Sequence, residues 1–169
     1  MRNFKKTIAL LTAAVLIADS APDAPAVAAC LAAYAALLAE RVPGLSPPHA
    51  PGPAFDAAAE AALYRPPHGA CLLARQDGNG VACVMLKRVA HGLGEVKRLW
   101  VDPAARGQGL ARRMMAAIED RARAMGMTAL RLDTNENLPE AIALYRATGW
   151  HEIAPFTAFP ATHWFGKAL

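Results

Sequence analysis

A chain of 169 residues, 54% of them hydrophobic and 19% charged, is long enough for one well-packed domain and too short for two of ordinary size. The net charge of +4 is weak evidence for a nucleic-acid partner, because Arg2, Lys5 and Lys6 supply three of those charges. Three cysteines without C-x-x-C spacing argue against a disulfide framework. Five histidines that never pair at i+3 or i+4 argue against a metal site, so we expect neither metal nor nucleic acid.

The N-terminus allows two interpretations. Residues 1–12 are expected to form a tail ahead of a single domain at residues 13–169, in a cytoplasmic protein. The alternative is export, because the apolar run Ile8–Ala18 follows three basic residues, as in a secretory signal peptide. Polar residues and prolines separate that run from a processing-like sequence at Cys30. The run is also too short to span a bilayer, so we favour the tail and expect no membrane partner.

The first half of the chain alternates apolar segments with proline and glycine signals. Ala13–Ala18 predicts a strand, and Ser20 with Asp23 three residues later predicts a capping box at the start of an amphipathic helix. Pro43 and Gly44 end that helix, and a proline-rich loop follows. The next expected elements are a short helix (Phe55–Tyr64), an antiparallel hairpin (Ala70–Arg75 and Val81–Arg88) and a third strand (Glu95–Val101).

Helix and strand signals alternate in the second half. A helix over Leu110–Met125 has an apolar face and a charged face that includes Glu119, and Gly126 ends it. The whole order implies an α/β (α+β) fold, with a mixed, mostly antiparallel sheet flanked by helices and a central parallel strand pair. The last expected elements are a strand (Ala129–Asp133), a helix (Pro139–Ala147) with Asn137 as its N-cap, and strands at Trp150–Ile153 and His163–Phe165.

The loop between the third strand and the long helix has the chemistry of an anion site. Backbone N–H groups in the first turn of a helix have no intrahelical partner, and the helix dipole adds partial positive charge there. Gly107 and Gly109 allow the backbone to approach an anion closely. Such a loop alone is also typical of a structural turn, so the segments around it decide its meaning.

Two segments resemble the motifs of the GCN5-related N-acetyltransferase (GNAT) superfamily. Leu99–Gly109 resembles the acetyl-CoA pyrophosphate motif, with Arg106-x-x-Gly109-x-Ala111 between a central strand and a long helix. Ala141–Trp150, which contains a Leu-Tyr pair and a Gly-Trp pair, resembles the second hallmark of the family. Both motifs stand in the family's order, and the resemblance covers the chain from about residue 13 to its end.

The resemblance implies how acetyl-CoA, the co-substrate, would be held. The pyrophosphate would lie on backbone N–H groups of the glycine loop, with Gly109 the least replaceable because a side chain there would collide with phosphate. Leu99 and Val101 would offer backbone groups to the pantetheine arm. Many relatives have a cofactor-contacting asparagine where this chain has Leu138, and Asn137 lies beside that position. The candidate cofactor-binding residues are Leu99, Val101, Arg106, Gly107, Gln108, Gly109, Leu110, Ala111 and Asn137.

The resemblance also implies two catalytic residues. Aminolysis of a thioester needs a neutral amine and a proton for the departing thiolate, and an alkyl amine with a pKa of about 10 is protonated at neutral pH. Tyr145 matches the family tyrosine that is often the general acid; the alternative is an aromatic ring packed on the sheet. Glu95 lies on the central strand near where several relatives carry a catalytic glutamate; the alternative is a structural residue, salt-bridged to Lys97. Alternation places Glu95 on the same strand face as Leu99 and Val101, unless a bulge intervenes.

The function implied by these residues is N-acetylation. Acetyl would pass from acetyl-CoA directly to a primary amine of a small molecule or amino acid. A non-catalytic acyl-CoA-binding sensor on the same fold is the first alternative, and a nucleic-acid-binding module is the second. The identity of the acceptor and the oligomeric state, a homodimer included, stay open.

Overall fold

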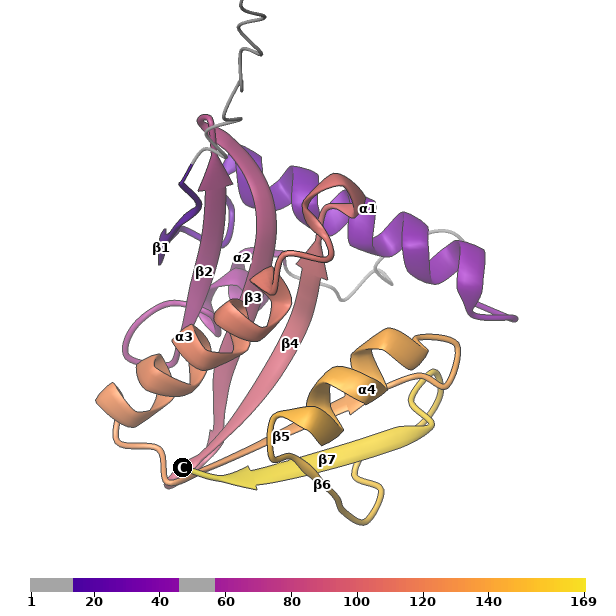
Figure 1. Ribbon diagram of the computed structural model, residues 1–169. Coiled ribbons are helices and arrows are strands. Elements are labelled where there is room, and N and C mark those ends of the chain that lie inside the picture. Colours follow the sequence, from indigo (N-terminus) through magenta and orange to yellow (C-terminus); the bar gives the residue numbers. More distant parts are fainter. Residues whose placement is uncertain (1–13, 46–56) are drawn as a thin grey trace, which may run out of the picture.

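The computed structural model describes residues 14–45 and 57–169, which form a seven-stranded sheet and the helices that cover it (Figure 1). The strand order is β1-β2-β3-β4-β5-β7-β6, and neighbours are antiparallel except for the parallel pair β4 and β5. The expected mixed, mostly antiparallel sheet with one parallel pair is confirmed. The elements are β1 Leu16–Asp19, α1 Pro25–Arg41, α2 Ala57–Ala62, β2 Gly69–Gln76, β3 Asn79–Ala90, β4 Leu93–Val101, the 3-10 turn η1 Pro103–Ala105, α3 Leu110–Ala124, β5 Ala129–Thr134, α4 Pro139–Ala147, β6 His151–Glu152 and β7 His163–Ala168.

Each face of the sheet carries an apolar core, because alternate residues of a strand point in opposite directions. Ala82, Val84 and Leu86 of β3 belong to a core shared with α3 and α4. Cys83 and Met85 belong to a smaller core shared with α1. In Figure 1, α3 lies across β2 to β4 and α4 lies across β5 and β7. The helices α3 and α4 therefore cover one face, and α1 covers the other.

The parallel strands β4 and β5 stay together only at one end. Leu93–Glu95 of β4 pairs with Ala129–Arg131 of β5, after which β4 continues to Val101 without pairing with β5 (Figure 1). The edge of β4 that faces β5 therefore has no strand partner beyond Glu95 among the described residues. Its backbone donors and acceptors are available there to an extended ligand.

A bulge in β4 overturns the expected arrangement of its side chains. Cys83 of β3 pairs with Trp100, and Met85 pairs with Lys97. Between these two pairs, one residue of β3 therefore lies opposite two residues of β4. Arg98 occupies the bulge with a φ of 57°. The extra residue reverses the alternation, so Leu99 and Val101 contact the α3 core, whereas Trp100 joins the α1 core. Glu95 and Lys97 therefore do not share a face with Leu99 and Val101.

Two expected N-caps are wrong, and a proline at the first helical position accounts for both. The helix α1 begins at Pro25, and its N-cap Ala24 has no side-chain capping bond. Ser20 instead follows β1 directly, and its N–H donates to the Cys71 carbonyl of β2 over 2.9 Å. The helix α4 begins at Pro139 behind Leu138, which likewise caps nothing with its side chain, so Asn137 is not the N-cap.

The expected solvent position of Glu119 on α3 is also wrong. Its carboxylate is buried and accepts bonds from Lys167 Nζ of β7 at 2.8 and 2.9 Å and from Trp150 Nε1 at 3.2 Å. A buried charge has a low free energy only when it is paired in this way. The expected starts at Ala13 and Phe55 lie outside the described residues.

Candidate functional site

Two adjoining cavities open where β4 and β5 separate. One, the α3 cavity, has a volume of about 360 Å³ and lies between β4, the glycine loop and the first turn of α3. The other, the β5 cavity, has a volume of about 240 Å³ and lies against the ends of β5 and α4. The residues that line both are Tyr34, Leu99, Leu138 and Ala141. A ligand in the α3 cavity can therefore reach a second molecule in the β5 cavity.

The α3 cavity ends at a helix N-terminus that is built for an anion. Gly109 is the N-cap of α3 with a φ of 73°, and it makes no side-chain capping bond. Gly107 has a φ of 76°, and a Cβ added at either glycine would meet no atom within 4 Å. The left-handed backbone and the open space leave first-turn N–H groups directed at an accessible volume. This cradle fits a pyrophosphate group.

The structure brings together most of the cofactor residues predicted from the sequence. The α3 cavity is lined by Leu99, Val101, Arg106, Gly107, Gly109, Leu110 and Ala111. Gln108 is exposed in the same loop and lines neither cavity. Asn137 also lines neither cavity, because its amide N–H and side chain both bond to Asn135 Oδ1, at 2.9 and 2.8 Å.

The arginines near the glycine loop differ in what they can reach. Arg106 donates from Nε to the Val101 carbonyl over 3.1 Å, which ties the loop to the end of β4. Arg112 lines the α3 cavity. Arg113 instead donates to the Val15 carbonyl over 2.9 Å, beside β1. The side chain of Arg112 can therefore approach an anion from the rim of the cavity, whereas Arg106 and Arg113 are each held by a backbone carbonyl.

Tyr145 lies in the β5 cavity, at the last turn of α4. Its ring packs at tilted angles against Trp150 and Phe165, with centroids 6.1 and 5.6 Å away. Burial, followed by the neighbouring Tyr34 and Asp133, raises the pKa of Tyr145. Burial likewise raises the pKa of Tyr34 to about 12. Both phenols therefore keep their protons at neutral pH, and that of Tyr145 is held at the cavity by a fixed ring.

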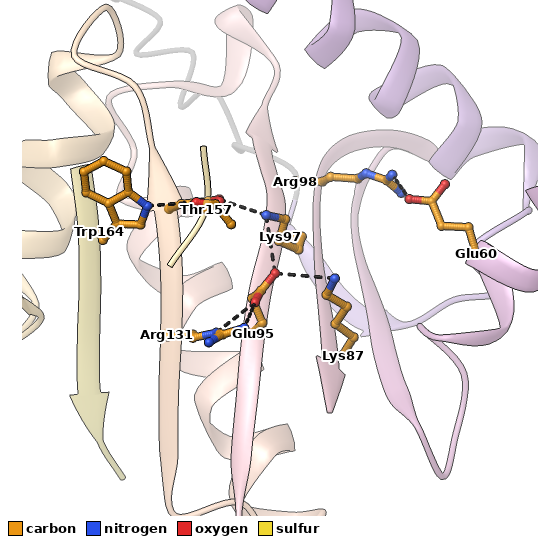
Figure 2. Close-up of polar contacts among 9 residues, drawn as sticks. Glu60, Lys87, Glu95, Lys97, Arg98, Arg131, Thr157 and Trp164 are labelled. Carbon is orange, nitrogen blue, oxygen red and sulfur yellow. Dashed lines mark hydrogen bonds and ion pairs between the residues drawn. The ribbon is translucent and has the colours of Figure 1, made fainter. Parts of the chain in front are cut away.

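Glu95 lies at the centre of a charge cluster, outside the lining of both cavities. Its Oε2 accepts bonds from Arg131 at 2.9 and 2.8 Å, and its Oε1 lies 3.4 Å from Lys87 Nζ and 3.5 Å from Lys97 Nζ (Figure 2). Three strands supply these cations: β3, β4 and β5. The ion pair with Lys97 that the sequence proposed as an alternative is present.

Asp133 is a carboxylate of the site that sequence reasoning missed. It lines the β5 cavity together with Tyr145, near the end of β5. Its Oδ1 accepts from Lys97 Nζ over 2.8 Å, and its Oδ2 accepts from the Thr157 hydroxyl over 2.8 Å. Trp164 in turn donates to Thr157 over 2.8 Å, and Figure 2 shows this chain of contacts from Trp164 to Glu95. A carboxylate at the end of a central parallel strand was the available signal.

Comparisons with known proteins give the site its context. The model of the acetyltransferase (GNAT) family matches residues 34–150. An IAA acetyltransferase from Azospirillum brasilense is 44% identical over 86 residues, which are 50% of this chain and 56% of that protein. The chain therefore spans little more than half the length of such curated relatives.

Solved structures share the fold. A proposed acyl-CoA N-acyltransferase from Klebsiella pneumoniae matches with a TM-score of 0.72 and 30% identity, over 92% of this chain and 97% of that one. A family member from Elizabethkingia anophelis, solved with acetyl-CoA bound, matches with a TM-score of 0.53 and 14% identity, over 60% and 77% of the two chains.

Residues 14–45 and 57–169 contain neither a candidate membrane span nor a candidate metal cluster. None of their helices is long and apolar enough to cross a membrane. They also contain no group of three or more histidine, cysteine, aspartate or glutamate residues that could hold a metal ion.

Proposed function

This chain belongs to the acetyltransferase (GNAT) family, and on that premise we propose that it transfers acetyl from acetyl-CoA directly to a primary amine of a small molecule or amino acid. The observation that carries the proposal is the junction of the two cavities. One cavity ends at an uncapped helix N-terminus, the other contains a buried tyrosine, and the two share four lining residues.

The α3 cavity suits the donor. Acetyl-CoA supplies the activated acetyl group as a thioester. The backbone N–H groups at the start of α3 would bind its pyrophosphate, with Gly107 and Gly109 giving the close approach that phosphate oxygens need. The free edge of β4, near Leu99, would pair with the extended pantetheine arm. That placement directs the reacting end of the donor toward the shared residues and Tyr145.

Tyr145 is the group that we propose as general acid. Its phenol is protonated at neutral pH, since the ordinary pKa of tyrosine is about 10 and burial raises that of Tyr145 further, and it lines the cavity next to the donor site. A positioned acid protonates the departing thiolate and thereby prevents its return to the carbonyl carbon. Tyr34, from α1, also lines both cavities at this junction.

The β5 cavity suits a small acceptor. Its volume of about 240 Å³ admits a small molecule or one amino-acid side chain. Its charged lining residues are Lys97, Arg98 and Asp133, and the guanidinium of Arg98 is paired with Glu60 (Figure 2). The sequence assigned the amine proton to Glu95, and that role stays a hypothesis. The contacts of Glu95 favour its structural alternative.

The experiment is a thiol-release assay with acetyl-CoA against a panel of amines and amino acids. We expect release of CoA with a subset of the panel, and a loss of about 10²- to 10⁴-fold in kcat for Tyr145→Phe, which keeps the ring packing. Acetyl-CoA binding without thiol release with any amine would support the alternative, a non-catalytic acyl-CoA sensor. Undiminished turnover in Tyr145→Phe would remove Tyr145 as the acid.

A further inference from the structure

The acceptor amine needs a base for its proton. Two carboxylates at or beside the β5 cavity, Asp133 and Glu95, are candidates for that base. Resting on the proposed function, we propose that Asp133, and not Glu95, accepts the proton of the acceptor amine. Glu95 then acts as a positioning residue that holds the cations around it.

The two carboxylates differ in how accessible they are to an amine in the β5 cavity. Asp133 lines the cavity that contains Tyr145, and 16% of its side chain is exposed. Glu95 lines neither cavity, and 5% of its side chain is exposed. A base must come within hydrogen-bond reach of the proton it takes, directly or through one water. An amine in the β5 cavity meets that condition at Asp133.

Contacts separate them further. Lys87 and Lys97 lie against one oxygen of Glu95, and Arg131 bonds to the other, so cations occupy the directions from which an amine would approach. Among the described residues, each oxygen of Asp133 accepts one hydrogen bond, from Lys97 Nζ or from the Thr157 hydroxyl. A carboxylate offers about four acceptor positions, so Asp133 keeps positions for a further donor.

Lys97 links the two carboxylates and explains what Glu95 does. Its Nζ lies 2.8 Å from Asp133 Oδ1 and 3.5 Å from Glu95 Oε1 (Figure 2). Because the ion pair with Glu95 fixes the position of Lys97, the ion pair between Lys97 and Asp133 fixes the orientation of the Asp133 side chain toward the cavity. A cation this close also favours the neutral form of an incoming amine, which is the nucleophile.

The step balances in protons and electrons. Asp133 takes one proton from the ammonium group, and the freed nitrogen lone pair forms the C–N bond while the C–S bond breaks. Tyr145 gives its proton to the departing sulfur and regains one from the new amide nitrogen. Asp133 then releases its proton to solvent, so each turnover yields one amide, one CoA thiol and one proton.

The test compares two acceptors of nearly the same shape in the full chain. One is the alkyl amine that the wild type acetylates fastest, and the other is its β,β,β-trifluorinated analogue, whose amine is largely neutral at the assay pH. For Asp133→Asn we expect kcat/KM with the alkyl amine to fall by about 10²- to 10⁴-fold, and with the fluorinated amine by at least about tenfold less. Glu95→Gln, which leaves the Asp133 carboxylate in place, should lower the value with the alkyl amine by a smaller factor than Asp133→Asn does.

Control variants separate proton transfer from structure. Thr157→Val removes the second partner of Asp133 and should lower alkyl-amine activity less than Asp133→Asn does. Asp133→Glu, which keeps a carboxylate, should recover part of that activity. Acetyl-CoA affinity should be unchanged in all four variants. The opposite pattern, an amine-dependent loss in Glu95→Gln but not in Asp133→Asn, would overturn the inference and leave the proposed function standing. Absence of thiol release by the wild type with every amine would overturn both.

Discussion

The two cavities of this protein are made in different ways. The α3 cavity uses backbone: a short, continuous loop with two left-handed glycines leads into a helix whose first N–H groups are uncapped. The β5 cavity uses side chains from α1, β4, β5, α4 and the segment before β7, which lie far apart in the sequence. A site made from backbone tolerates variation in side chains, whereas a site made from side chains changes with each of them. The proposed donor site is therefore recognisable across a family, and the proposed acceptor site is particular to one protein.

The substitution with the largest expected effect disrupts the backbone anion site of the α3 cavity. Gly109→Glu should weaken acetyl-CoA binding by at least about 100-fold, because it places a carboxylate at the anion site and strains a φ of 73°. Gly126→Glu is the matched control, since Gly126 has a φ of 74° and equally open surroundings away from both cavities. Titration calorimetry with acetyl-CoA measures both, and equal losses in the two variants would show that strain alone is responsible.

A second prediction tests whether the two regions fold as one unit. Glu119 of α3 and Lys167 of β7 join the donor side to the acceptor side through a buried pair at 2.8 Å. Lys167→Met should lower the free energy of unfolding by about 3 kcal/mol, because it leaves a buried carboxylate with only Trp150 as a donor. Urea denaturation followed by circular dichroism and by tryptophan fluorescence should give coincident transitions. Separate transitions for the two probes would contradict a single cooperative unit.

A smaller effect on acetyl-CoA affinity is expected at the arginines near the glycine loop, where side chains add to the backbone contacts. Arg112→Ala should weaken acetyl-CoA binding only about fivefold, or roughly 1 kcal/mol, because backbone N–H groups carry most of the phosphate contact. Arg113→Ala should not change it, since Arg113 is bonded to Val15. Raising the salt concentration should reduce the Arg112 effect. A loss for Arg112→Ala as large as that for Gly109→Glu would mean that side chains, not backbone, hold the donor.

The last prediction is that kcat does not fall as the pH rises above neutrality. Burial raises the pKa of Tyr145 above its ordinary value, so the phenol stays protonated as the pH rises and the acid is present throughout. We expect kcat to show no loss from neutral pH to about pH 10. A stopped-flow or continuous thiol assay with a saturating acceptor measures this. A fall in kcat well below that pH, absent in Tyr145→Phe, would show that the phenol is not shielded as described.

The sequence predicted what local signals specify. The glycine loop, the hairpin turn at Asp77 and Gly78, and the apolar face of α3 depend on residues close in the chain, and all three are present. The bounds of α4 were predicted correctly, whereas those of the first strand and of α1 were less accurate, because pairing with β2 sets β1 at Leu16–Asp19 and proline sets the start of α1 at Pro25.

What the sequence did not predict depends on contacts between distant elements. The bulge at Arg98 exists only because β3 pairs with β4 in one register, and it decides which face each later residue joins. The cluster around Glu95 gathers side chains from β3, β4 and β5. In the sequence Asp133 is an ordinary residue at the end of a strand. Only the fold brings it next to Thr157 and into the same cavity as Tyr145. These residues belong to the acceptor side, where local pattern carries little information.

One measurement tests the central claim, a backbone donor site joined to a side-chain acceptor site, most directly. Acetyl-CoA affinity and amide formation, followed by mass spectrometry of the acceptor, are measured side by side for the wild type, Gly109→Glu and Tyr145→Phe. We predict that Gly109→Glu loses both, whereas Tyr145→Phe binds acetyl-CoA as the wild type does and forms little amide. Normal amide formation by Gly109→Glu, or a loss of acetyl-CoA binding in Tyr145→Phe equal to that in Gly109→Glu, would contradict it.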